Sequence, residues 1–145
     1  MSTDEVYGES MIDVNEKHKT EHSILCPTNP YAATKAGAEL IAQSYNHSFN
    51  MPIIVTRGNN VYGPNQYPEK LIPVIINCII SNKNIPIYGN GENIRDWLFV
   101  EDHIDAILKI VLEGAEGKTY CIGGSNEYTN LQIANLICDF LNKEL

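Results

Sequence analysis

The fold of this chain is decided by residues 29–60, which read NPYAATKAGAELIAQSYNHSFNMPIIVTRGNN. Apolar residues recur there at helical spacing and predict a helix from about Tyr31 to Asn50. The β-branched run at 52–56 follows directly and predicts a short buried strand. We expect one apolar stripe of the helix to face the core, and it comprises Ala38, Ile41, Ala42, Tyr45 and Phe49.

The alternation of helix and strand continues through the rest of the chain. Strands are predicted at 85–88, 96–100 and 118–122, and helices at 69–82, 102–113 and from about residue 130. The buried face of the helix at 102–113 is expected to carry Ile104, Ile107, Leu108 and Val111. Residues 10–30 lack periodicity and predict a long loop. This pattern indicates an α/β fold with a mainly parallel sheet, in which ligands bind at the carboxyl ends of the strands.

Composition limits the class of partner. The chain has 145 residues, a size typical of one domain, and a net charge of −8. A field of that sign repels phosphate backbones and anionic lipid, so we expect no nucleic-acid and no membrane partner. No apolar run reaches the ~20 residues of a membrane span, and the acidic start is unlike a signal peptide. A cytoplasmic protein is therefore expected.

One string in the predicted loop matches a metal-binding pattern. Residues 18–22 read HKTEH, as in the H-x-x-E-H motif of some zinc proteases. That chemistry needs both histidines on one face of a helix, whereas this stretch lies in the loop just before Cys26-Pro27. We therefore expect no metal site.

Tyr31 and Lys35 are the first group of residues that carry chemistry. They lie one helical turn apart, on the side of the apolar stripe. A lysine at this position packs its stem while its ammonium reaches solvent. Alternatively, its charge stabilises the phenolate of Tyr31 and makes this residue a base near neutral pH. The spacing alone leaves both interpretations open.

Two further groups contain charged side chains. Asp4 and Glu5 stand beside a hydroxyl and could donate and accept protons, although a solvated acidic segment has the same composition. Arg95 follows the glycine turn at 89–91, which suits it to a bidentate contact with a diphosphate. Asn59, Lys70 and Tyr88 complete this last group. Taken singly, each of these charges fits a solvated surface equally well.

Together these segments resemble one family. NPYAATKAGAE (29–39) is similar to the active-site motif of extended short-chain dehydrogenases, and STDEVYG (2–8) resembles the catalytic segment of nucleoside-diphosphate-glucose 4,6-dehydratases. Three more similar stretches follow in family order: RGNNVYGPNQYPEKLIP (57–73), PIYGNGENIRDWLFVEDH (86–103) and TYCIGGSNEYTN (119–130). The resemblance covers nearly the whole chain and points to dehydratases that act on dTDP-glucose or UDP-glucose.

The resemblance implies a division of the chain into two portions. The fold would be the C-terminal portion of a Rossmann-type parallel sheet plus part of a smaller substrate-binding domain. A partial NAD-binding portion with the catalytic residues would occupy residues 1–66. A partial sugar-nucleotide-binding portion would occupy residues 67–145, interleaved with the first in one compact unit. The resemblance also implies a homodimer.

The resemblance further implies NAD as cofactor and a sugar nucleotide as substrate. Tyr31 would take the 4-hydroxyl proton of the sugar, while Lys35 holds Tyr31 and the cofactor ribose. Glu5 would remove the C5 proton as Asp4 protonates the departing 6-hydroxyl. Thr3 would bind the sugar near O4, and Asn60 would lie on the nicotinamide side. The residues implied to bind the sugar nucleotide are Asn59, Lys70, Leu71, Pro86, Ile87, Tyr88, Arg95 and Asn130.

The chain also departs from the family pattern. It contains no glycine-rich dinucleotide fingerprint and almost no strand before Thr3. We therefore expect a truncated piece of a longer enzyme that is inactive by itself, because catalysis needs a rigid supporting shell. Two other interpretations stay open. One is a 4-epimerase or decarboxylase of the same superfamily, which the Asp4-Glu5 pair disfavours, and the other is a non-catalytic sugar-nucleotide-binding fragment.

Overall fold

The computed structural model describes residues 1–8 and 18–141. Part of the loop predicted at 10–30 therefore lies outside the described residues. The chain divides into two compact units, of which the first takes in residues 1–59 and 102–122. The second unit takes in residues 60–101 and 123–145.

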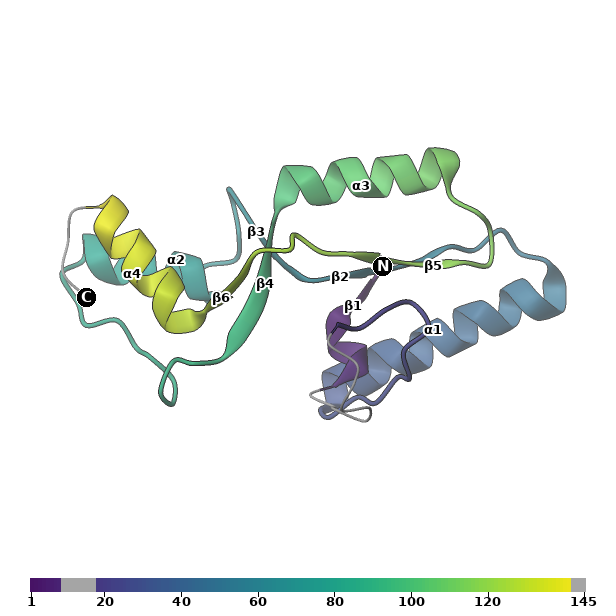
Figure 1. Ribbon diagram of the computed structural model, residues 1–145, viewed down its shortest axis with the longest axis horizontal. Coiled ribbons are helices and arrows are strands. Elements are labelled where there is room, and N and C mark those ends of the chain that lie inside the picture. Colours follow the sequence, from purple (N-terminus) through teal and green to yellow (C-terminus); the bar gives the residue numbers. More distant parts are fainter. Residues whose placement is uncertain (9–17, 142–145) are drawn as a thin grey trace. The chain divides into compact units, whose positions relative to one another are not determined.

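A parallel three-stranded sheet organises the first unit. Its strands are β1 (Ser2–Thr3), β2 (Val55–Gly58) and β5 (Thr119–Ile122), paired in the order β1-β2-β5. Helices α1 (Pro30–Phe49) and α3 (Val100–Glu113) lie on opposite sides of this sheet (Figure 1). A short 3-10 helix, η1 (Asp4–Tyr7), follows β1 directly. The predicted α/β fold with a parallel sheet is confirmed.

Local sequence signals set the ends of α1. The side chain of Asn29 caps the helix by accepting a hydrogen bond from the backbone N–H of Ala32 at 2.9 Å, and Pro30 occupies the first turn. The helix ends at Phe49, and the next residue, Asn50, has a left-handed φ of 51°. These bounds agree with the predicted helix at 31–50.

The predicted inner faces of α1 and α3 are wrong at most positions, and only Ala42 and Ile107 of the predicted residues are half-buried. On α1 the buried residues are Ala32, Ala36 and Glu39, whereas Ile41 and Phe49 of the predicted stripe are 62% and 68% exposed. On α3 the buried residue is His103, and the predicted Ile104, Leu108 and Val111 are exposed. For α1 the physical reason is a buried charge on Glu39 that has an ionic partner inside the unit, which rotates the apolar stripe outward.

A mixed sheet and two packed helices form the second unit. Strands β3 (Asn60–Tyr62) and β4 (Ile94–Phe99) are parallel, and β6 (Glu127–Thr129) pairs with β4 antiparallel. Helix α2 (Leu71–Ile80) packs on α4 (Asn130–Phe140), which opens with a capping box formed by Thr129 and Gln132. The core between these helices consists of Ile75, Ile79, Ala134 and Cys138.

Four short segments differ from the sequence-based expectation. The strand predicted at 85–88 is absent, because Ile85 and Ile87 pack on the helical core without joining a sheet. Strands β3 and β6 were not predicted, since three-residue strands with polar residues carry almost no periodic signal. The strand predicted at 52–56 instead lies at Val55–Gly58.

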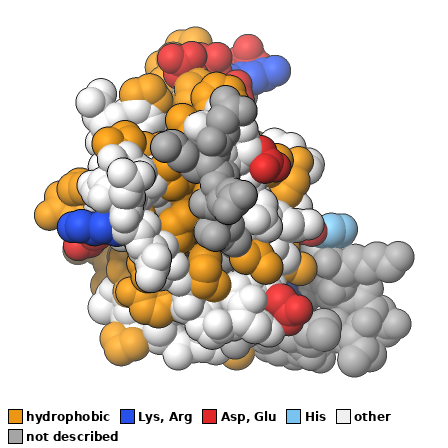
Figure 2. Space-filling model, turned by 90° about the vertical axis from the view of Figure 1, so that its left-hand side faces the viewer, with side chains coloured by type: hydrophobic (Ala, Val, Ile, Leu, Met, Phe, Trp, Pro, Cys, Tyr) orange, Lys and Arg blue, Asp and Glu red, His pale blue; other side chains and the backbone are white. Residues whose placement is uncertain are grey.

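Much apolar surface of the second unit stays exposed. Figure 2 shows hydrophobic side chains gathered on the face that carries α2 and α4. Ile80 and Phe140 are 73% and 86% exposed, and an apolar groove of about 640 Å³ runs past Ile76, Ile137 and Phe140. Surfaces of this kind are typical of contact sites.

Within the described residues, no helix has the length and apolarity that crossing a bilayer requires.

A glycine pair in the first unit offers a direct test of the packing. A Cβ at Gly58 would stand 2.7 Å from Cε1 of His103, whereas a Cβ at Gly37 in α1 would meet nothing within 4 Å. Gly58→Ala should therefore lower the free energy of unfolding by about 1–3 kcal/mol through overpacking. Gly37→Ala should raise it by about 0.5–1 kcal/mol, because glycine is costly inside a helix. Urea unfolding of both variants measures the two effects, and a harmless Gly58→Ala would contradict this packing.

Candidate active site

Thr3, Asp4 and Glu5 lie at the carboxyl end of β1, where η1 begins. The Thr3 hydroxyl accepts a hydrogen bond from the backbone N–H of Glu5 at 3.3 Å and donates to Asp4 Oδ1 at 3.2 Å. Thr3 pairs with Gly58, the last residue of β2, so the carboxyl ends of both strands meet at one edge of the sheet. The half-buried Asn59 directly follows β2 at that edge.

Two hydrogen bonds join this acidic segment to the beginning of α1. Nδ2 of Asn29 donates to Oε2 of Glu5 at 3.2 Å, and Nζ of Lys35 donates to the backbone carbonyl of Met1 at 3.1 Å. Tyr31 lies between Asn29 and Lys35 in the sequence. It is 54% exposed, and its hydroxyl has no hydrogen-bond partner in the described part of the chain. The structure thus brings the acid-pair segment and the Tyr31–Lys35 helix together within the first unit.

A groove of about 300 Å³ in the second unit collects most of the other predicted residues. Those that line it are Asn60, Leu71, Pro86, Tyr88, Arg95 and Asn130. Sequence reasoning missed three further lining residues, Glu69, Val74 and Trp97, which carry no motif of their own. Two predicted residues do not line this groove: Lys70 stands at the N-terminus of α2, and Ile87 packs against the helical core.

A glycine turn shapes one wall of the groove. Gly91 has a φ of 73°, and a Cβ there would stand 2.9 Å from Cγ2 of Ile87, so only glycine fits without strain. The Gly91 carbonyl accepts a hydrogen bond from the backbone N–H of Leu131 at 3.0 Å, and the Asn93 carbonyl accepts one from Asn130 at 3.1 Å. The turn is therefore tied to the first residues of α4.

Arg95 is the cation of this groove. Its side chain is exposed and donates only to the Ile94 carbonyl at 3.3 Å, with no carboxylate partner among the described residues. An unpaired guanidinium in a concave site is suited to bidentate binding of phosphate or carboxylate. The groove can therefore bind an anionic group beside the exposed Tyr88 ring.

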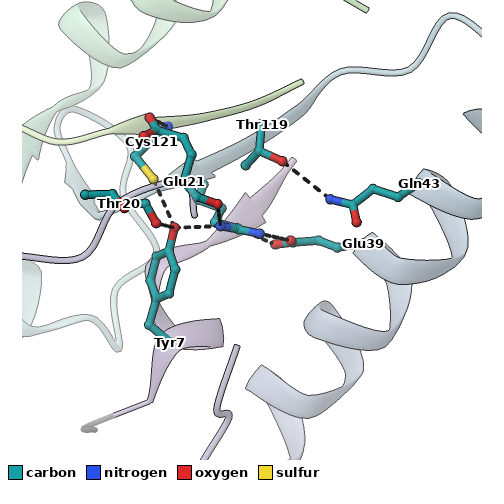
Figure 3. Close-up of polar contacts among 8 residues, drawn as sticks. Tyr7, Thr20, Glu21, Glu39, Gln43, Thr119 and Cys121 are labelled. Carbon is teal, nitrogen blue, oxygen red and sulfur yellow. Dashed lines mark hydrogen bonds and ion pairs between the residues drawn. The ribbon is translucent and has the colours of Figure 1, made fainter. Parts of the chain in front are cut away.

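Sequence reasoning also missed a buried polar cluster in the first unit (Figure 3). Arg57 and Glu39 are each 4% exposed and form an ion pair of 2.7 Å between Nη2 and Oε2. Nε of Arg57 adds a bond of 3.0 Å to the same carboxylate, and Nη1 donates to the Tyr7 hydroxyl at 2.6 Å. The Tyr7 hydroxyl donates to the Thr20 carbonyl at 2.8 Å and also lies 3.1 Å from Sγ of Cys121.

Burial decides the charge states in this cluster. Desolvation raises the pKa of both the Tyr7 phenol and the Cys121 thiol, so both are neutral at physiological pH. Desolvation alone would lower the pKa of Arg57, but its hydrogen bonds to Glu39 and Tyr7 outweigh this effect and raise the pKa overall. The cluster is thus one ion pair surrounded by neutral donors and acceptors. The available sequence signal was an arginine at the end of a strand predicted to be buried.

The string at 18–22 does not form the helix that a zinc-protease motif requires, since these residues lie in an irregular turn. Glu21 instead accepts a hydrogen bond from the backbone N–H of Cys121 at 2.9 Å, and this bond lowers its pKa. No group of three or more His, Cys, Asp or Glu side chains in residues 1–8 and 18–141 is arranged to hold a metal ion.

Comparison with known proteins gives one consistent result. The profile of the NAD dependent epimerase/dehydratase family matches residues 1–123. The chain is 47% identical over 144 residues to a dTDP-D-glucose 4,6-dehydratase of Dictyostelium discoideum, a match that covers 94% of the chain. The dTDP-glucose 4,6-dehydratase of Bacillus anthracis, solved in complex with NAD, superposes with a TM-score of 0.93 at 45% identity over 99% of the chain.

A structure with a different printed activity is also similar. The UDP-glucuronic acid 4-epimerase of Bacillus cereus, a Y149F mutant solved with a fluorinated UDP-sugar and NAD, superposes with a TM-score of 0.92 at 27% identity over 99% of the chain. The chain spans 33% of the Dictyostelium protein, 45% of the Bacillus anthracis chain and 45% of the epimerase chain. It therefore corresponds to less than half the length of each of these relatives.

Proposed function

Because this chain belongs to the NAD dependent epimerase/dehydratase family, we propose that it carries the catalytic residues of a nucleoside-diphosphate-glucose 4,6-dehydratase. The observation that carries this proposal is the junction of η1 with α1. There the Asn29–Glu5 and Lys35–Met1 hydrogen bonds hold an acid pair next to a tyrosine–lysine pair. Elimination of water from a sugar by this route requires both pairs. The oxidation step needs a base, and the elimination step needs an acid together with a second base.

The first unit has donors that suit the ribose of a nicotinamide cofactor. Lys35 has three N–H donors, and the described contacts use one of them, on the Met1 carbonyl. The other two can donate to ribose hydroxyls beside the hydroxyl of Tyr31. Bound NAD would accept a hydride from the sugar and return it. We place Asn60, the first residue of β3, on the nicotinamide side.

The residues of this chain would move the protons. Tyr31 takes the proton of the sugar 4-hydroxyl, and the resulting 4-ketone acidifies the C5–H bond. Glu5 removes the C5 proton while Asp4 protonates the 6-hydroxyl, which leaves as water. Thr3, hydrogen-bonded to Asp4 at 3.2 Å, holds the sugar near O4, and Asn59 contacts the substrate at the same edge of the sheet. The product is a 4-keto-6-deoxy sugar nucleotide.

The groove of the second unit would bind the nucleoside diphosphate. Arg95 holds the diphosphate together with Asn130, and the exposed Tyr88 packs with Pro86 around the base. Leu71 lines the sugar, and Lys70 adds a positive charge nearby. Against a net charge of −8, these local cations supply the attraction for an anionic ligand. The dTDP and UDP sugars share this chemistry and differ at the base.

The exposed stripe of α1 supports a homodimer. Ile41, Tyr45 and Phe49 lie one turn apart and are 62%, 48% and 68% exposed, a continuous apolar face that a second copy of the helix would cover.

A cytoplasmic location is supported by the four cysteines, none of which is in a disulfide.

The activity is tested with the full-length protein expressed from its gene and supplied with dTDP-glucose or UDP-glucose. Wild-type protein should form the 4-keto-6-deoxy sugar, detected by its absorbance in alkali. Glu5→Gln should lower product formation by about 100-fold or more, because the base for C5 is lost, while reduced nicotinamide still accumulates. Glu127→Gln removes another exposed carboxylate, from β6, and should leave turnover unchanged.

Three outcomes would contradict this assignment. A galacto-configured sugar nucleotide as the only product would indicate the 4-epimerase alternative. Loss of both reduced nicotinamide and product in a folded Glu5→Gln variant would remove the assigned role of Glu5. Tight nucleotide binding without turnover under any condition would favour the non-catalytic fragment.

Arg95→Ala should weaken the binding of UDP and dTDP by about 10- to 100-fold, since a charged hydrogen bond contributes ~1.5–3 kcal/mol. Lys83→Ala removes a positive charge from an exposed loop of the same unit and serves as the matched control. Titration calorimetry measures both variants. Equal affinities for the two variants would show that the groove does not hold the diphosphate.

Ile41→Glu combined with Phe49→Glu should convert the dimer into a monomer, because two charges would be buried in the apolar contact. Leu108→Glu on α3 is the control, since Leu108 is 53% exposed but lies outside the stripe. Analytical ultracentrifugation reports the mass. A monomeric wild type, or dissociation by Leu108→Glu alone, would contradict a dimer through α1.

A further inference from the structure

Arg57 lies at the centre of the first unit and uses every nitrogen of its guanidinium. Nε and Nη2 donate to the Glu39 carboxylate at 3.0 and 2.7 Å, while Nη1 donates to the Tyr7 hydroxyl at 2.6 Å and to the Glu21 carbonyl at 3.3 Å. The guanidinium carbon also lies 4.9 Å from the centre of the Tyr7 ring. Such a planar fork fixes the direction of each partner as well as its distance.

The two side-chain partners of Arg57 each belong to a segment with proposed catalytic residues. Glu39 follows Lys35 by one helical turn and lies on the buried face of α1 with Ala36. Tyr7 is the last residue of η1, which begins with Asp4 and Glu5. Arg57 itself lies on β2, the strand between β1 and β5. One side chain of β2 therefore contacts both α1 and η1.

Burial makes these contacts costly to break. The side chains of Arg57 and Glu39 are 4% and 3% exposed, so neither charge has water as an alternative partner. Removing one member of a buried pair typically costs ~3–5 kcal/mol, which keeps the helix from rotating away from Arg57. A rotation of α1 would move Tyr31 and Lys35, and a shift of Tyr7 would move the acid pair.

We propose that Arg57 is a positioning residue for the dehydration, which holds the acid-pair segment through Tyr7 and the Tyr31–Lys35 helix through Glu39. This inference rests on the proposed function. It assigns distinct effects to the two contacts of Arg57. The contact with Tyr7 positions Asp4 and Glu5, which act in the elimination step. The contact with Glu39 positions Tyr31 and Lys35, which act in the oxidation step.

The test compares Tyr7→Phe with wild type in the full-length protein. Tyr7→Phe keeps the ring against Arg57 and removes only the hydroxyl. The elimination step should slow by about 10- to 100-fold, because a displacement on the order of 1 Å has that effect on a reacting geometry. The oxidation step should stay within about twofold, so bound reduced nicotinamide accumulates during turnover. The affinity for UDP and dTDP should hold, since the groove proposed to bind them lies in the second unit.

Two further variants separate positioning from a loss of stability. Glu39→Gln should slow oxidation more than elimination, without accumulation of reduced nicotinamide. Gln43→Met alters the next turn of the same helix face, where Gln43 donates to Thr119 at 3.4 Å, and should leave both steps unchanged. A merely structural role would lower the active fraction and slow both steps equally in Tyr7→Phe and Glu39→Gln. That result would overturn the proposal.

Amide hydrogen exchange tests the same proposal without turnover. The backbone N–H of Cys26 donates to the Val6 carbonyl at 2.9 Å, and that of Gly8 donates to the Glu5 carbonyl at 3.0 Å. Both amides should exchange faster in Tyr7→Phe if the hydroxyl holds this segment. If the wild type is inactive but both amides exchange faster in Tyr7→Phe, the proposed dehydratase activity is refuted. The inference that Arg57 holds this segment through Tyr7 is then retained. Unchanged exchange in Tyr7→Phe would overturn the positioning role whatever the activity.

Discussion

The buried ion pair between Arg57 and Glu39 is the constraint on which the first unit depends. Two charges that are removed from water must meet each other with good geometry, so β2 and α1 have one relative orientation that satisfies them. That orientation places Ala32, Ala36 and Glu39 inward and turns the apolar stripe of α1 outward. It also directs the first turn of the helix, with Tyr31 and Lys35, toward the segment that follows β1. The outward stripe is then left exposed.

The acid pair reaches its place by a different means. Parallel pairing of β1 with β2 brings Thr3 level with Gly58, and η1 turns the chain immediately afterwards. Asn29 serves both segments, since its Oδ1 caps α1 and its Nδ2 binds Glu5. The second unit builds its groove from a left-handed glycine turn and a capped helix, which together place Arg95 near Asn130. Each site therefore depends on local backbone geometry as much as on the side chains that line it.

The elements that sequence reasoning predicted well are those with long periodic patterns. The four helices, the strand near 55 and the strand near 119 are all present, because periodicity over ten or more residues or a compact β-branched run is a strong signal. Five residues predicted to bind the sugar nucleotide line one groove of the second unit, together with Asn60, which was predicted to bind the cofactor. The helix faces were predicted wrongly, because hydrophobic periodicity shows that a stripe exists and does not show whether the core or another chain covers it. The Arg57 cluster was missed since its members are scattered between residues 7 and 121.

The sequence by itself determined the family, the α/β class and the motif positions of the chemistry-bearing residues, because these depend on residue type and local spacing. Only the tertiary structure decided which residues stand together: Glu5 with Asn29, Lys35 with the Met1 carbonyl, and Arg57 with both Glu39 and Tyr7. The physical reason is that a buried charge selects its partner by three-dimensional geometry and desolvation, and neither is encoded in the distance along the chain.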